Sequence, residues 1–161
     1  LLRYVGLDQP DIQNRLIEKF NAHAVTKERI TFLGAATQEE LLATYNQIDI
    51  GLDPTPYSGG VTTLEAVWMG VPVVTRGGPN FASRHSITHL NHCGLDDWVK
   101  QSDEAFVETC QYWSEHLDEL SELRKSLRQK LLNSPACDGK QYAHDFAKFA
   151  RQIWKDYLSQ D

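Results

Sequence analysis

The chain has 161 residues, of which 41% are hydrophobic and 24% are charged, a composition typical of one soluble domain with a hydrophobic core. Its 16 Lys and Arg against 22 Asp and Glu give a formal net charge of −6. This balance argues against nucleic acid or an anionic membrane as a partner, because both need clustered positive charge. No apolar run approaches the roughly 20 residues of a membrane span.

The cysteines and histidines do not predict a metal site. Cys93, Cys110 and Cys137 are far apart and have no metal-ligand spacing. They are typical of reduced thiols in a cytoplasmic protein, which is the location that we expect. His89 and His92 lie near Cys93, but a zinc site requires four well-spaced ligands.

Short apolar runs alternate with helical patterns from the first residue onwards. The opening run, LLRYVG, lacks an initiator Met and is typical of a strand interior, so we expect a fragment of a longer protein. Helices are predicted after Pro10, after Thr37, which opens a capping box with Glu40, and from about Leu64 to Gly70. Strands are predicted at residues 1–5, 30–33, 48–52 and 71–75. The alternation indicates βαβ units and a parallel sheet covered by helices.

The remainder of the chain is helical in pattern. We predict a βα core over residues 1–100 and C-terminal helices over residues 101–161, within a single Rossmann-like domain. An apolar stripe through Tyr142 and Tyr157 is expected to pack against the protein. The four tryptophans are expected to be mostly core anchors; they are Trp68, Trp98, Trp113 and Trp154.

The stretch LDPTPYSGGVTTLEAVWMGVPVVT carries the strongest functional signal. It leaves a predicted strand and enters a predicted helix, and ligands of open parallel sheets bind outside the carboxyl ends of the strands. The bare backbone of Gly59 and Gly60 allows close approach, and first-turn amides have no intrahelical partner. Together with the helix dipole and the hydroxyls of Thr62 and Thr63, these groups suit a diphosphate. The alternative is a plain strand-to-helix turn, since the stretch has neither GxGxxG nor the lysine of a P-loop.

Glu65 allows two interpretations. Thr62-Thr63-Leu64-Glu65 has the form of a capping box, in which the carboxylate accepts the Thr62 amide. Alternatively, a carboxylate one turn into a helix that holds a diphosphate is well placed to accept the vicinal hydroxyls of a sugar.

Three motifs follow one another along the chain: DPTPYSGGVTTLEAVWMGVPVVT, ASR at residues 82–84 and SPACDGKQY at residues 134–142. In this order they resemble the C-terminal part of the O-GlcNAc transferase/SPINDLY glycosyltransferase family, and the resemblance covers nearly the whole chain. It implies the C-terminal half of a GT-B fold, which is a Rossmann-like α/β lobe with a parallel sheet, helices on both faces and C-terminal helices after it. This lobe would bind the donor of an inverting transferase that moves GlcNAc from a nucleotide sugar to Ser or Thr of proteins. No cofactor or metal is implied. An N-terminal lobe and tetratricopeptide repeats would precede the chain.

The resemblance also assigns roles to single residues. Glu65 falls where the family binds the donor ribose, and Gly60, Val61 and Thr62 fall on its diphosphate loop. Ala36 falls where backbone groups meet the nucleotide base. The lysine that the family places on the diphosphate lies upstream of this chain, so we expect no catalytic residue in the fragment and no turnover from it alone.

The basic residues near the loop are weaker candidates. Arg76 and Arg84 lie close enough in sequence to reach it, although structural pairing is a common role for arginine and is the interpretation we favour for Arg84.

The chain departs from the animal enzymes of this family at three positions. They have His and Thr where this chain has Gly60 and Val61, and Leu41 replaces a His near the base. The donor therefore stays open between UDP-GlcNAc and other nucleotide sugars such as GDP-fucose. Two other functions stay open as well: a GT-B enzyme acting on glycans or lipids, and a non-catalytic module that binds a nucleotide or a protein.

Overall fold

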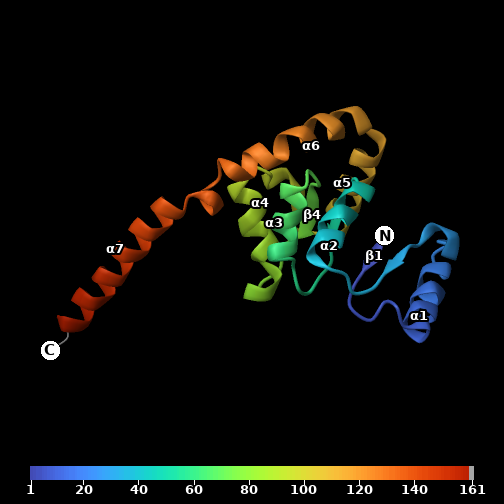
Figure 1. The fold of residues 1–161 in the computed structure, drawn as a ribbon, viewed down its shortest axis with the longest axis horizontal. Coiled ribbons are helices and arrows are strands. Elements are labelled where there is room, and N and C mark those ends of the chain that lie inside the picture. The colour runs from blue at the N-terminus through green and yellow to red at the C-terminus, as the bar shows by residue number, and fades with distance from the viewer. Residues whose placement is uncertain (160–161) are drawn as a thin grey trace. The chain divides into compact units, whose positions relative to one another are not determined.

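The structure, a computed structural model, describes residues 1–159. It divides into two compact units, Leu1–Ile48 and Asp49–Asp161, and each is described by itself. Both contain parallel strands connected by helices, so the predicted α/β class is confirmed (Figure 1). A single domain over residues 1–161 stays a prediction.

The first unit is a pair of parallel strands with helices. Strand β1 (Leu2–Arg3) pairs with β2 (Phe32–Leu33), and α1 (Pro10–Asn21) connects them, with a 3₁₀ turn at Lys27–Arg29. The predicted strands at residues 1–5 and 30–33 are present but shorter.

Helix α2 (Gln38–Thr44) follows β2 and leads to a 3₁₀ turn at Tyr45–Gln47. Its capping box is confirmed, because Oγ1 of Thr37 accepts the Glu40 amide at 3.3 Å and the Glu40 carboxylate accepts the Thr37 amide at 2.8 Å.

The second unit contains a parallel sheet in the order β3-β4-β5. Its strands are β3 (Gly51–Asp53), β4 (Val73–Arg76) and β5 (Val99–Lys100). Asp53 lies opposite Thr75, which lies opposite Val99. Strand β5 is not among the predicted strands. It has only two residues and directly follows a 3₁₀ turn (Asp96–Trp98), so it leaves no periodic pattern in the sequence.

Helices surround β4 and build the core of the second unit. Three of them, α3, α4 and α5, pack against β4, and α6 packs against α3 (Figure 1). Val67, Val74, Leu90 and Leu127 are fully buried, and each contributes about 1.5–3 kcal/mol through removal from water. The helices and 3₁₀ turns are α3 (Val61–Trp68), Phe81–Ser83, α4 (His85–His92), α5 (Asp103–Glu115), α6 (Leu117–Leu132), Pro135–Cys137 and α7 (Gly139–Leu158).

Helix α3 ends at a glycine, as predicted. Gly70 has a φ of +78°, which favours glycine because a side chain strains this conformation. Its amide donates to the carbonyl of Val67 at 3.1 Å, and the amide of Val71 donates to the carbonyl of Ala66 at 2.8 Å. This pair of bonds is a Schellman motif, which satisfies carbonyls that the helix leaves without partners.

Two arginines of α6 bind the same end of α3. Nε of Arg124 donates to the carbonyl of Gly70 at 2.9 Å, and Nε of Arg128 donates to the carbonyl of Trp68 at 2.8 Å. The Arg128 guanidinium also lies 5.1 Å from the centre of the Trp68 ring. Positive charge at a helix carboxyl end complements the helix dipole, so these contacts stabilise α3.

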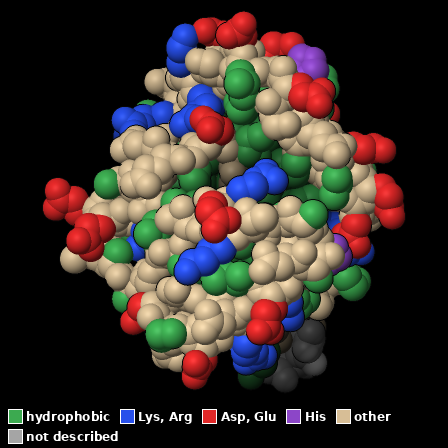
Figure 2. Space-filling view, turned by 90° about the vertical axis from the view of Figure 1, so that its right-hand side faces the viewer, with side chains coloured by type: hydrophobic (Ala, Val, Ile, Leu, Met, Phe, Trp, Pro, Cys, Tyr) green, Lys and Arg blue, Asp and Glu red, His purple; other side chains and the backbone are tan. Residues whose placement is uncertain are grey.

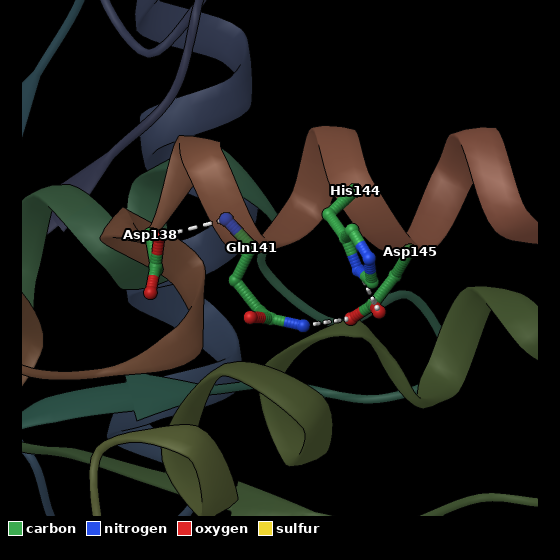
Figure 3. A network of polar contacts seen from close by, with 4 residues as sticks. All are labelled: Asp138, Gln141, His144 and Asp145. Atoms are coloured by element: carbon green, nitrogen blue, oxygen red, sulfur yellow. Dashed lines mark hydrogen bonds and ion pairs between the residues drawn. The ribbon is translucent and has the colours of Figure 1, made fainter.

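The start of α7 is fixed by a polar network (Figure 3). Asp138 caps the helix by accepting the amide of Gln141 at 2.9 Å. The side-chain amide of Gln141 donates to Asp145 at 2.9 Å, and His144 lies 3.3 Å from the same carboxylate. These hydrogen bonds lower the pKa of Asp145, with the bond from Gln141 as the largest cause.

The stripe of α7 does not pack in this structure, so that expectation is wrong for the chain as it stands. Phe146 and Phe149 expose 61% and 64% of their surface, and Tyr142, Ile153 and Tyr157 are exposed as well.

The expectation for the tryptophans holds in part. Trp98 is buried and stacks on the half-buried Trp113, with ring centres 5.0 Å apart, whereas Trp68 and Trp154 are exposed.

Charged side chains of both signs are interspersed on the face that Figure 2 shows, without a broad basic surface there. Among residues 1–159, no helix has the length and apolar character needed to cross a membrane.

Candidate functional site

The glycine loop, residues 58–60, lies between β3 and α3. Asp53 ends the strand, and Gly60 is the N-cap of the helix with no side chain capping it. Because β4 is parallel to β3, the loop follows the carboxyl end of this sheet, which is the edge where ligands of parallel sheets bind.

Gly59 is required for packing inside this loop. A Cβ atom on Gly59 would stand 2.5 Å from Oγ1 of Thr63 and 2.9 Å from Oγ1 of Thr62, both far inside normal contact. Its amide is directed at Asp53 and donates to Oδ1 at 2.7 Å. Gly59 therefore brings the loop close to α3 rather than offering its own amide to a ligand.

The next two amides are placed differently. In the part of the chain that the structure describes, the amides of Gly60 and Val61 donate no hydrogen bond. The Val61 side chain is 70% exposed, and a Cβ on Gly60 would find only one atom at 4.0 Å, from His85. Two amides at the positive end of α3 thus remain available to an anion.

Asp53 connects the loop to the sheet, although it is not among the predicted site residues. Its side chain is buried, and Oδ2 accepts the Thr75 hydroxyl at 2.6 Å while Oδ1 accepts the Gly59 amide. Thr75 is fully buried. The signal was available in the sequence, because an acidic residue ends an apolar strand immediately before the loop.

Helix α4 is bonded to the loop through two buried serines. The amide of His85 donates to Oγ of Ser58 at 3.0 Å, and Oγ of Ser58 donates to the carbonyl of Ala82 at 3.1 Å. Oγ of Ser86 donates to the carbonyl of Gly59 at 2.9 Å and lies 2.8 Å from Oγ1 of Thr63. Residues 82–86 therefore support the loop from outside its own sequence.

Thr62 and Glu65 lie on α3 beyond the loop, where Thr62 is exposed and Glu65 is half-buried. The capping-box interpretation of Glu65 is wrong, because the helix begins at Val61 and Gly60, not Thr62, is its N-cap. The ribose interpretation stays a prediction.

Ala36 belongs to the first unit. It is exposed, follows β2 and precedes Thr37, the N-cap of α2. Its predicted contact with the nucleotide base stays a prediction.

The two basic residues near the loop, Arg76 and Arg84, differ in whether their side chains have partners. Arg76 forms an ion pair with Asp103 at 2.9 Å, at the start of α5, so it has a structural partner. Arg84 is exposed and precedes α4, and within residues 1–159 its guanidinium forms no ion pair or hydrogen bond.

An open pocket of about 460 Å³ lies at the other end of the second unit. It is formed around Asp49, two residues before β3, the carboxyl end of α3 and the start of α6, so it is separate from the glycine loop. Within residues 1–159, no group of three His, Cys, Asp or Glu side chains is placed to hold a metal ion. The pocket is lined by Asp49, Met69, Gly70, Leu117, Leu120, Ser121, Arg124 and Lys125.

Comparison with known proteins identifies the fold and the family of the chain. A solved structure of a mutant O-GlcNAc transferase from Thermobaculum terrenum superimposes with a TM-score of 0.88 at 36% identity, covering 96% of this chain and 30% of that one. A probable UDP-N-acetylglucosamine–peptide N-acetylglucosaminyltransferase SPINDLY from Solanum lycopersicum is 36% identical over 117 residues, or 73% of this chain. The UDP-N-acetylglucosamine–peptide N-acetylglucosaminyltransferase of Caenorhabditis elegans is 27% identical over 159 residues.

The fold is therefore the C-terminal α/β fold of a GT-B glycosyltransferase. The family described as Glycosyl transferase family 41 matches residues 1–146, and the chain belongs to this family. The chain spans 13% of the length of the tomato relative and 14% of that of the nematode relative.

Proposed function

We propose that the complete protein is an inverting protein O-glycosyltransferase and that this chain is its donor-binding lobe. The observation that carries the proposal is the start of α3, where the amides of Gly60 and Val61 have no acceptor among the described residues. The relatives are named for transfer of N-acetylglucosamine from a UDP donor to peptide. By analogy, the donor here is UDP-GlcNAc and the acceptor is a Ser or Thr hydroxyl of a protein.

The glycine loop suits the chemistry of this transfer. When the bond between the sugar C1 and the diphosphate breaks, the electron pair stays on the diphosphate. Hydrogen-bond donors that are already in place stabilise this growing charge more than they stabilise the bound substrate. In other enzymes, loss of one such donor costs about 10²–10³ in rate. We assign this role to the amides of Gly60, Val61 and Thr62 and to the Thr62 hydroxyl.

Glu65 and Ala36 are each assigned one contact with the donor. The carboxylate of Glu65 accepts the two ribose hydroxyls, since it offers two acceptor oxygens and lies on α3 beyond the diphosphate amides. Backbone groups at Ala36 meet the base. The acceptor site and any general base belong to the N-terminal lobe, and the diphosphate-binding lysine lies upstream of Leu1. The protein acts in the cytoplasm without a metal.

Calorimetric titration of the complete protein with UDP and GDP in parallel tests this proposal. We expect saturable binding of one of them, UDP if GlcNAc is the sugar. The Glu65→Ala variant should bind it more weakly, because the ribose hydroxyls lose a charged acceptor. The matched control is Glu108→Ala, which removes an exposed glutamate of α5 and should leave affinity unchanged.

Two results would contradict the proposal. One is a complete protein that binds neither diphosphate. The other is a Glu65→Ala variant with a lower melting temperature and unchanged affinity, which would make Glu65 a structural residue only.

A further inference from the structure

The side chain of His85 lies against the glycine loop. His85 is the first residue of α4 and is half-buried. If Gly60 carried a Cβ atom, the single heavy atom within 4 Å of it would be Nδ1 of His85, at 4.0 Å. The imidazole therefore borders the side of Gly60 that the glycine leaves open, next to the amides to which we assign the diphosphate.

The backbone holds this imidazole in position. The His85 amide is bonded to Ser58 of the loop, and the next side chain, Ser86, is bonded to the Gly59 carbonyl. Ser58 and Ser86 expose 3% and 0% of their surface. Hydrogen bonds buried to this degree resist exchange with water. The hydrogen bonds of Ser58 and Ser86 therefore fix both the loop and the backbone that bears the imidazole.

Two aromatic rings contact the imidazole. The centre of the Phe81 ring lies 4.5 Å away at 80°, and that of Tyr57 lies 5.9 Å away at 83°. Both are edge contacts, which restrict the ring but are not hydrogen bonds to its nitrogen atoms. In residues 1–159, neither imidazole nitrogen of His85 has a hydrogen-bond partner or a carboxylate within ion-pair distance.

The titratable groups near the ring include Tyr57, which is in edge contact with it, the preceding Arg84, and His89, one turn along α4. The Asp53 carboxylate belongs to the same loop, but it is buried and already accepts the Gly59 amide and the Thr75 hydroxyl. Burial lowers the pKa of His89, and the charges of His85 and His92 lower it further. An imidazole without a hydrogen-bond partner among the described residues, beside amides without acceptors, is a surface that an anion completes.

We propose that the His85 imidazole contacts the diphosphate of the nucleotide-sugar donor and donates a hydrogen bond to it. This inference rests on the proposed function, and it adds a catalytic residue from α4 to the donors of the glycine loop. During transfer, C1 of the sugar bonds to the acceptor oxygen, the electron pair of the broken bond stays on the diphosphate, and the acceptor proton leaves to a base. His85 keeps its own proton and stabilises the leaving charge.

Paired titrations of the complete protein test the inference. The probes are UDP or GDP, whichever binds, and the nucleoside of the same base. The His85→Ala variant should bind the diphosphate at least about tenfold more weakly, because a hydrogen bond to a charged group is lost. Its affinity for the nucleoside should not change. The His85→Asn variant, which keeps a donor near the Nδ1 position, should bind the diphosphate more tightly than His85→Ala. The control is His92→Ala, which alters an exposed histidine of the same helix.

The possible outcomes separate the two proposals. If the unaltered protein binds neither UDP nor GDP, the proposed function fails first. If it binds one of them and His85→Ala binds the diphosphate equally well, the role of His85 is wrong and the proposed function stands. Equal weakening for the diphosphate and the nucleoside, with a lower melting temperature, would make His85 a structural residue and would also overturn the inference.

Discussion

The amide of Gly59 donates a 2.7 Å hydrogen bond to Oδ1 of Asp53, six residues earlier at the end of β3. The second carboxylate oxygen of Asp53 accepts the hydroxyl of Thr75 in β4. One buried side chain thus connects the glycine loop to two strands. The loop therefore takes its shape from the sheet as well as from its own residues.

Replacing Asp53 should loosen this connection. Asp53→Ala leaves the Gly59 amide and the Thr75 hydroxyl without their acceptor, and we expect the free energy of unfolding to fall by about 2–4 kcal/mol. Asp53→Asn keeps one oxygen for Gly59 and places an amide against Thr75, whose hydroxyl can accept, so it should lose only about 1 kcal/mol. Urea denaturation measures both. Equal losses for the two variants would show that the hydrogen bonds of Asp53 do not hold the loop.

Gly59 should tolerate no side chain. In Gly59→Ala the new methyl group would overlap the hydroxyls of Thr62 and Thr63, and relief of this overlap should cost about 1–3 kcal/mol. The matched control is Gly139→Ala at the first position of α7, where a Cβ meets no atom within 4 Å. Thermal unfolding should show a lower midpoint for Gly59→Ala alone. A midpoint that is the same in both variants would contradict the close packing of the loop on α3.

The three cysteines should react at different rates. Burial raises the pKa of the Cys93 thiol and of the Cys110 thiol, so little thiolate forms at pH 8, whereas Cys137 is exposed. Titration of the native protein with an aromatic disulfide should show a fast phase from Cys137, followed in absorbance. The Cys137→Ser variant should lack this phase. A fast phase that persists in the variant would contradict the burial of the other two thiols.

The exposed stripe of α7 should make the isolated chain of 161 residues self-associate. Sedimentation velocity should show species larger than the monomer that increase with concentration. Replacing Phe146, Phe149 and Ile153 together by Gln should shift the distribution toward monomer. Gln at Lys148 and Arg151, on the same helix, serves as the control. A monomer at all concentrations before any substitution would contradict this expectation.

Local sequence signals predicted much of the fold. Thr37 and Glu40 are three residues apart, and the box they form depends on little beyond the first turn of α2. Gly70 ends α3 by adopting a positive φ, which depends on the type of this one residue. Such features need no distant partner, and for that reason the sequence alone was sufficient.

Features that depend on distant residues were missed or wrongly interpreted. The bond between Asp53 and Thr75 joins residues 22 apart, and the contacts of Ser58 with α4 join residues 27 apart, so no local pattern announces them. The spacing of Glu65 from Thr62 fits a capping box, but the helix starts earlier, at Val61.

Helix α3 is only eight residues long, about 12 Å. Arg124 and Arg128 of α6 bind its carboxyl end. Asp53 and Ser86 hold Gly59, which precedes its N-cap. Because hydrogen bonds hold both ends of this short helix, it cannot shift or tilt without breaking several of them at once. The peptide dipoles in the first turn of α3 are therefore already oriented before an anion binds. Substitution of Arg124 or Arg128 in α6 should therefore make the orientation of the amides at the opposite end of α3 less well defined.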